Sequence, residues 1–164
     1  MRMIHCRLEG QSGHDAGRAL LAQLYQEATG ETLPEIRILE RGKPCFADGG
    51  FHFSISHTPH HAFCALSENK IGIDAEELDR KINLKLADKI LSESEKAQFD
   101  EAKEKNRALL TFWVLKEAEA KLTGEGLRGY PNHTHFSLED PRVTEIEGCL
   151  VAVLEEKGDK THAV

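Results

Sequence analysis

Two charged stretches constrain the fold of this chain more than any other feature, because their charges recur at regular spacings. The first is an apolar run, Ile71–Glu76, that contains Asp74 and Glu76, and residues two apart in a strand point to the same side. In the second, Glu117 and Lys121 are four residues apart, so in a helix they are stacked neighbours. If the strand and the helix face each other, three carboxylates and an ammonium group converge. That set suits a divalent cation that holds a phosphate ester.

Each stretch also has an ordinary structural explanation. The strand carboxylates could be solvated groups at the start of an acidic loop, since Glu77 and Asp79 follow them. Glu117 and Lys121 could form a simple helix-stabilising pair, worth about 0.2–0.5 kcal/mol. Neither stretch alone shows whether its charges form a functional site or an ordinary solvated surface.

Composition limits the possible classes. The 164 residues are enough for one domain with a core and too few for two ordinary domains. A formal net charge of −7 argues against nucleic-acid binding, which normally needs a basic excess. No apolar run reaches the roughly 20 residues of a membrane helix, and the N-terminus lacks the apolar stretch of a signal peptide. We therefore expect a cytoplasmic protein.

The four cysteines lie far apart, and no two of them form a C-x-x-C pair. This spacing indicates reduced core residues, and neither a disulfide framework nor a zinc site. The residues concerned are Cys6, Cys45, Cys64 and Cys149.

The apolar pattern predicts two main helices. One is expected over residues 15–28, and Thr29 and Gly30 are expected to end it. A longer one is expected over about 106–123, where Gly124 is placed to cap the end. Ser92 opens a further helix with a capping-box signature.

Alternating or continuous apolar runs predict the strands. These are expected at residues 1–7, 51–56, 62–67, 71–75, 135–138 and 150–154. The third and fourth are expected to pair as a hairpin around residues 68–70. Because strands come in groups with helices between them, the predicted class is α+β with mostly antiparallel sheet.

His57 stands just past the strand at 51–56, where a loop residue can reach a ligand. The alternative is an ordinary surface histidine, since His60 and His61 follow closely. A metal site made of these three histidines is disfavoured, because their loop shows no fixed ligand spacing.

Four motifs occur in a fixed order: Gly42-Lys43-Pro44, Ser54–His57, Gly72–Glu76 and Trp113–Lys121. In this order and spacing they resemble the 4'-phosphopantetheinyl transferases, of the type that modifies carrier domains of peptide and polyketide synthetases. The match runs from about residue 15 to residue 126.

This resemblance implies a fold of two similar halves of antiparallel sheet packed with helices, within one domain of residues 1–164. The pseudo-halves would be about 1–66 and 67–164. The N-terminal half is abbreviated, since full-length relatives are longer. A monomer is expected, and Mg²⁺ and coenzyme A are the implied cofactor and co-substrate.

The resemblance also implies roles for individual residues. Asp74, Glu76 and Glu117 match the residues that hold Mg²⁺, and Glu117 is a candidate general base. His57 and Lys121 would join Glu117 in catalysis by contacting the diphosphate. The residues implied in coenzyme A binding are Arg18, Lys43, Ser56, His57, Lys116 and Lys121.

The implied reaction transfers the 4'-phosphopantetheine arm of coenzyme A to a serine hydroxyl of an apo acyl or peptidyl carrier protein. Adenosine 3',5'-bisphosphate is released. A rival interpretation is a non-catalytic protein of the same fold that binds coenzyme A or the carrier. A second rival is a regulatory module that binds a divalent cation through the acidic loop.

Carrier proteins are generally acidic, and so is this chain, so attraction would require a local concentration of positive charge. Lys81, Lys85 and Lys89 recur every four residues and would form one basic stripe if this segment is helical. The stripe is interpreted equally well as a carrier-docking surface or as a solvated helix face.

Overall fold

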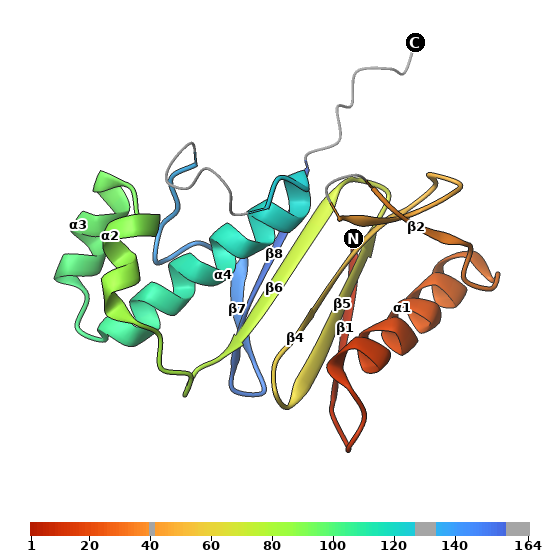
Figure 1. Cartoon of the computed structure of the whole chain (residues 1–164), viewed down its shortest axis with the longest axis horizontal. Coiled ribbons are helices and arrows are strands. Elements are labelled where there is room, and N and C mark those ends of the chain that lie inside the picture. Colours follow the sequence, from red (N-terminus) through yellow and green to blue (C-terminus); the bar gives the residue numbers. More distant parts are fainter. Residues whose placement is uncertain (40–41, 127–133, 157–164) are drawn as a thin grey trace, which may run out of the picture.

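The computed structural model describes residues 1–39, 42–126 and 134–156. Two long helices, α1 (Gly13–Thr29) and α4 (Lys105–Thr123), lie at opposite sides of the molecule with the strands between them (Figure 1). Each helix covers the outer face of one three-stranded antiparallel sheet. The α+β class with mostly antiparallel sheet is confirmed.

The two halves of the chain repeat one topology. In the first, β1 (Arg2–Arg7), β4 (His52–His57) and β5 (His61–Ser67) form a sheet in the order β1-β5-β4. In the second, β6 (Ile71–Glu77), β7 (Val143–Ile146) and β8 (Cys149–Glu155) form a sheet in the order β6-β8-β7. In both, a strand precedes the long helix and the last strand lies in the middle of the sheet. A small hairpin of β2 (Ile36–Ile38) and β3 (Pro44–Phe46) is added to the first half.

The predicted hairpin between β5 and β6 is wrong, although both strands exist. β5 pairs with β1 and β4, whereas β6 pairs with β8, so the turn at 68–70 carries the chain from one sheet into the other. Both strands are buried on both faces, so their apolar runs carry no information about which neighbour each one pairs with.

Two further expectations need correction. The strand predicted at 135–138 is irregular chain. β7, at residues 143–146, pairs with β8 on the side opposite β6. The segment that carries the three spaced lysines is not one helix. Asn83 caps a short 3₁₀ turn, η1 (Leu84–Leu86), that runs into α2 (Ala87–Ile90), so Lys81 precedes the helical part.

The helix ends follow the expected local chemistry. Ser92 begins α3 (Glu93–Glu101) with a full capping box, in which Glu95 returns the hydrogen bond. Gly30 and Gly124 end the two long helices in left-handed conformations, at φ 77° and 75°. Among the described helices, none combines the length and apolar character that crossing a membrane requires.

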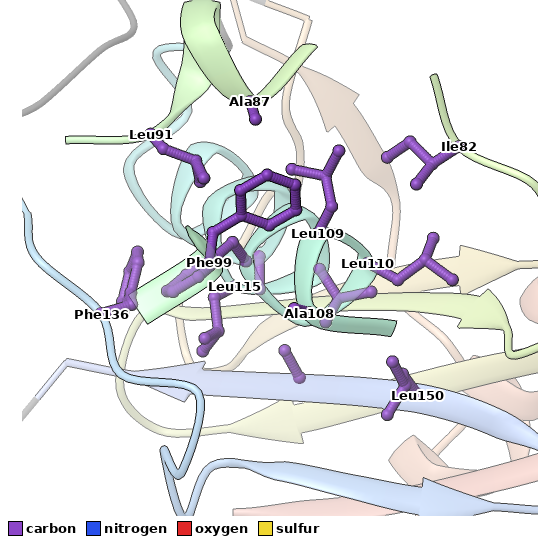
Figure 2. Close-up of a cluster of buried hydrophobic side chains, with 14 of the residues drawn as sticks. Ile82, Ala87, Leu91, Phe99, Ala108, Leu109, Leu110, Leu115, Phe136 and Leu150 are labelled. Atoms are coloured by element: carbon purple, nitrogen blue, oxygen red, sulfur yellow. The ribbon is translucent and has the colours of Figure 1, made fainter. Parts of the chain in front are cut away.

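Three apolar clusters hold these layers together. One surrounds α4, where Leu109 and Leu115 lie among side chains from α2, α3 and β8 (Figure 2). A second lies between α1 and its sheet. The third joins the inner faces of the two sheets, with Phe63 and Ala65 of β5 against Ile73 of β6. α1 and α4 therefore remain on the outside, and each packs mainly on the outer face of its own sheet.

The join between the sheets also has a polar part, which we call the serine seam. Ser54 Oγ accepts a hydrogen bond from the backbone N–H of Ile73, and Ser56 Oγ accepts one from that of Ala75, both at 3.1 Å. These serines are two apart in β4, so they point to the same side. Their hydroxyls take the place of a strand ladder along the free edge of β6.

Candidate functional site

The candidate site is built around Asp74, which is buried in the middle of β6 and faces α4. Its Oδ1 accepts hydrogen bonds from Lys121 Nζ at 2.8 Å and from Ser56 Oγ at 3.1 Å. Its Oδ2 is buried and has no hydrogen-bond partner among the described residues. Burial raises the pKa of Asp74, while Lys121 and Ser56 act in the opposite direction. A buried carboxylate oxygen without a partner is unusual in a folded protein and singles out Asp74 as a candidate ligand.

α4 brings two more charged groups to Asp74. Lys121 forms the ion pair, and its Nζ also lies 3.4 Å from the carbonyl oxygen of Ile55. Glu117 is one turn earlier on the same helix face and is half-buried. The pKa of Glu117 is raised, mainly by loss of water and next by the negative charge of Asp74. The predicted stacking of Glu117 and Lys121 thus places a carboxylate and an ammonium group over Asp74.

The approach of α4 depends on Gly72. A Cβ at this position would lie 1.9 Å from the carbonyl oxygen of Ala118 and 2.6 Å from the backbone nitrogen of Leu122. Only glycine therefore permits this contact between β6 and α4. A glycine inside an otherwise continuous apolar strand is the signal from which this close approach could have been inferred.

Glu76 lies on the same side of β6 as Asp74 but is held by different partners. Its Oε1 accepts a hydrogen bond from Trp113 Nε1 at 3.2 Å and forms an ion pair with Arg80. The Arg80 guanidinium also lies 5.8 Å from the centre of the Trp113 ring. Trp113 and Arg80 are thus site residues to which the sequence reasoning gave no role.

A pocket of about 280 Å³ opens beside this cluster. Glu117 and Lys121 line one part of it, and Lys43 lines another together with Ser54 and Ile55 of β4. Lys43 Nζ donates a hydrogen bond to the carbonyl oxygen of Leu122 at 2.7 Å, near the end of α4. Partial burial lowers the pKa of Lys43, and the charge of Lys70 adds to this effect. The charged side chains that line the pocket are therefore two lysines, Lys43 and Lys121, and one carboxylate, Glu117.

The other predicted coenzyme contacts lie in three different environments. Ser56 is buried beneath Asp74, so it orients that carboxylate. His57 is exposed at the end of β4 and packs against the start of α1, where a Cβ on Gly13 would be 2.5 Å from its ring. Arg18 is half-buried on α1.

Lys116 is not brought into the site. It is 1% exposed and forms an ion pair at 2.8 Å with Glu95, which is 0% exposed. Neighbouring helical residues point about 100° apart, so the face that directs Glu117 to Asp74 directs Lys116 into the core. The capping-box pattern predicts a local role for Glu95 and gives no signal of its pairing with Lys116.

The site's donors suit a hard divalent cation. Asp74 offers an unpartnered buried oxygen, and Glu76 and Glu117 add carboxylates from either side. Carboxylate oxygens are the ligands that Mg²⁺ prefers. Lys121 and Arg80 neutralise part of this charge in the structure described here. The donor chemistry therefore fits a metal bound through oxygen, but the oxygens of Asp74, Glu76 and Glu117 do not form a group within 4.8 Å of one another, so their side chains would have to close around the ion.

Comparison with known proteins identifies several relatives of this chain. The chain is 35% identical over 91 residues to 4'-phosphopantetheinyl transferase gsp of Aneurinibacillus migulanus, covering 54% of this chain and 37% of that protein. It is 34% identical over 91 residues to ffp of Bacillus subtilis, covering 54% of this chain and 40% of that protein. It is 36% identical over 115 residues to AcpT of Escherichia coli O157:H7, covering 66% of this chain and 56% of that protein. The latter two are also named 4'-phosphopantetheinyl transferases.

The chain thus spans between 37% and 56% of the length of these relatives. The sequence model of the 4'-phosphopantetheinyl transferase superfamily matches residues 70–160, a range that includes Asp74, Glu76, Glu117 and Lys121. Since this match covers more than half of the chain and contains the clustered charges, the chain belongs to the 4'-phosphopantetheinyl transferase superfamily.

Proposed function

We propose that this chain transfers the 4'-phosphopantetheine arm of coenzyme A to a serine hydroxyl of an apo carrier protein. The observation that carries the proposal is the unpartnered, buried Asp74 Oδ2 beside Lys121 and Glu117. This arrangement lies in the segment that matches the family, and the relatives named above are phosphopantetheinyl transferases. A cation site next to an ammonium group suits an anionic diphosphate substrate.

Asp74, Glu76 and Glu117 would hold Mg²⁺ in this proposal. When bound, Mg²⁺ supplies neutralisation of the diphosphate charge and fixes the direction of displacement. Ser56 keeps Asp74 in place through its hydrogen bond, so that Oδ2 remains directed away from Lys121.

Glu117 would take the proton from the attacking serine. A general base works best when its pKa lies close to the working pH, and burial together with Asp74 shifts the pKa of Glu117 in that direction. The serine oxygen forms a bond to phosphorus, and adenosine 3',5'-bisphosphate leaves with the bonding electrons. Lys121 lies where it can stabilise the charge that grows on the leaving phosphate.

Coenzyme A would occupy the 280 Å³ pocket and the surface next to it. Lys43 lines this pocket, and its hydrogen bond to Leu122 holds it at the end of α4. His57 stands at the N-terminal end of α1, where the helix dipole favours anions. Arg18, on the same helix, would bind the 3'-phosphate. Lys116 has no part in this proposal because it is buried with Glu95.

The carrier protein would dock near η1 and α2. Lys81, Lys85 and Lys89 are all exposed, and Leu84 beside them is 44% exposed. An apolar side chain surrounded by positive charges suits an acidic partner. The proposal also includes a cytoplasmic location and a monomeric state.

The decisive test is the mass of the carrier. The chain is incubated with coenzyme A, Mg²⁺ and a panel of apo carrier domains, and each carrier is expected to gain the mass of phosphopantetheine. Asp74→Asn should abolish the gain, while the matched control Asp100→Asn, an exposed carboxylate of α3 outside the proposed docking surface, should not affect it. If coenzyme A binds but no carrier gains mass, the chain is a non-catalytic coenzyme A-binding protein.

A further inference from the structure

A second cluster of ligand-type side chains lies outside the site described above. His61 is the first residue of β5, Glu77 the last of β6 and Cys149 the first of β8. One nitrogen, one oxygen and the sulfur of these residues lie within 4.8 Å of one another. Adjacent residues of a strand point to opposite faces, so Glu77 projects away from the face that carries Glu76. This group, here called the His-Glu-Cys cluster, is therefore separate from the Asp74 site.

The cluster is compact and protected from water. His61 Nδ1 lies 3.5 Å from Cys149 Sγ and 4.0 Å from Glu77 Oε1. His61 is 5% exposed and Cys149 is 0% exposed. A tetrahedral zinc ion with bonds of about 2.0–2.3 Å requires ligand atoms roughly 3.3–3.8 Å apart. Small side-chain movements would therefore bring all three atoms to bonding distance.

The surroundings orient the histidine as they would for a metal ligand. His61 Nε2 lies 3.1 Å from Glu147 Oε2 and has no hydrogen-bond partner among the described residues, while Nδ1 is on the side of the ring near Cys149 and Glu77. A carboxylate on the far nitrogen is the usual second partner of a metal-bound histidine. Within the described residues, Glu147 is the only non-glycine residue with a positive φ, 47°. The backbone of the β7–β8 turn is thus held in a rare conformation while its carboxylate contacts His61.

The carboxylate of the cluster is fixed as well. Glu77 Oε1 accepts a hydrogen bond from Thr58 Oγ1 at 2.8 Å, and His60 Nδ1 lies 2.9 Å from the same oxygen. His60 is largely exposed, so the cluster opens to solvent on this side. A fourth ligand would be water from this side.

We propose that His61, Glu77 and Cys149 bind a divalent transition-metal ion of the zinc class. Imidazole, thiolate and carboxylate together select a borderline ion such as Zn²⁺ over Mg²⁺, which prefers oxygen alone. Burial raises the pKa of Cys149 to about 11, so the thiol keeps its proton until a metal displaces it. The bound ion would tie β5 of the first sheet to β6 and β8 of the second. It stabilises the fold and is distinct from the Mg²⁺ of the proposed transfer reaction.

Cobalt titration of the reduced full-length chain tests the site directly. One equivalent of Co²⁺ is expected to give a sulfur-to-cobalt charge-transfer band and the visible absorption of a tetrahedral ion. Cys149→Ala should remove the charge-transfer band, and the matched control Cys64→Ala, another fully buried cysteine, should keep it. Asp74→Asn should keep it too, which separates this site from the proposed Mg²⁺ site.

Thermal unfolding supplies a second readout. Zn²⁺ should raise the melting temperature of the wild-type chain and of Cys64→Ala, and it should leave that of Cys149→Ala unchanged. If Cys149→Ala does not fold, Glu147→Gln retains all three ligands and should weaken Zn²⁺ binding about 10–100-fold. If the wild-type chain shows neither a charge-transfer band with Co²⁺ nor a higher melting temperature with Zn²⁺, the cluster is a hydrogen-bond network and the proposal is overturned.

Discussion

Gly72 of β6 lies directly under the carbonyl of Ala118 in α4, so close that no side chain fits between them. This contact sets the distance from the helix to the strand. Because Lys121 is less than one turn beyond Ala118, the same contact determines whether its ammonium group reaches Asp74.

Gly72→Ala is therefore expected to destabilise the protein by about 1–3 kcal/mol or more, since a backbone carbonyl and a backbone nitrogen would have to move. Urea unfolding measures the loss. Gly50→Ala is the matched control, because nothing lies within 4 Å of a Cβ built there, and it should stay within about 0.5 kcal/mol of the wild type. Equal stability of the two variants would contradict the close packing of α4 on β6.

The serine seam allows structure and function to be separated by one pair of variants. Ser54→Ala and Ser56→Ala each leave a buried N–H of β6 without its acceptor and should each cost about 1–3 kcal/mol. Only Ser56 also holds Asp74, so only Ser56→Ala should raise the Mg²⁺ concentration needed for carrier modification. Unfolding curves and a Mg²⁺ titration of the transfer assay measure the two effects. Identical Mg²⁺ curves would show that Ser56 has no role beyond the seam.

Glu117→Gln should stabilise the fold while it lowers activity. The raised pKa of Glu117 means that its ionised form is disfavoured in the folded state, so stability decreases as pH rises from the unfolded pKa of about 4.3 through the folded value. Glutamine removes the cost of ionising this side chain in the folded protein at pH 7. Below pH 4 it gives no gain in stability, because Glu117 is then protonated in both the folded and the unfolded state. Because the side chain is half-exposed, the gain should stay below about 1 kcal/mol.

Urea unfolding of Glu117→Gln at pH 7 and pH 4 checks the sign of the change in the free energy of unfolding. The control Glu101→Gln, an exposed residue with the same change of charge, should show no comparable gain at pH 7. A Glu117→Gln protein that is less stable than the wild type at pH 7 would contradict the assigned direction.

The buried pair of Lys116 and Glu95 should behave as one unit. Lys116→Met leaves a fully buried carboxylate without its cation and should cost about 3–5 kcal/mol. The double variant Lys116→Met with Glu95→Gln should recover part of that loss, because no uncompensated charge remains. A double-mutant cycle from unfolding curves gives the coupling, and additive losses would show that the two residues act independently.

Sequence reasoning located those parts of the fold that depend on local chemistry. The glycine caps at Gly30 and Gly124, the capping box at Ser92 and the apolar period of α4 are each encoded within a few residues. The side-by-side placement of Glu117 and Lys121 follows from helix geometry alone and is also observed.

What could not be predicted depends on residues far apart in the chain. The pairing of β5 and β6 with different sheets is decided by β1, β4 and β8, and nothing in either strand specifies those partners. The inward direction of Lys116 becomes evident only once Glu95 of α3 is placed against it. The His-Glu-Cys cluster joins residues 88 positions apart, so no spacing rule could detect it.

The serine seam has a consequence for how the two halves are joined. A strand ladder would join the sheets through backbone groups that substitution leaves in place, whereas these two acceptors are side-chain hydroxyls. The polar part of the join between the halves is therefore carried at these two positions by side chains, which a single substitution can remove. The pocket beside it is lined from both halves of the chain, by Lys43 and by Lys121, so a molecule bound there would add a further link between them.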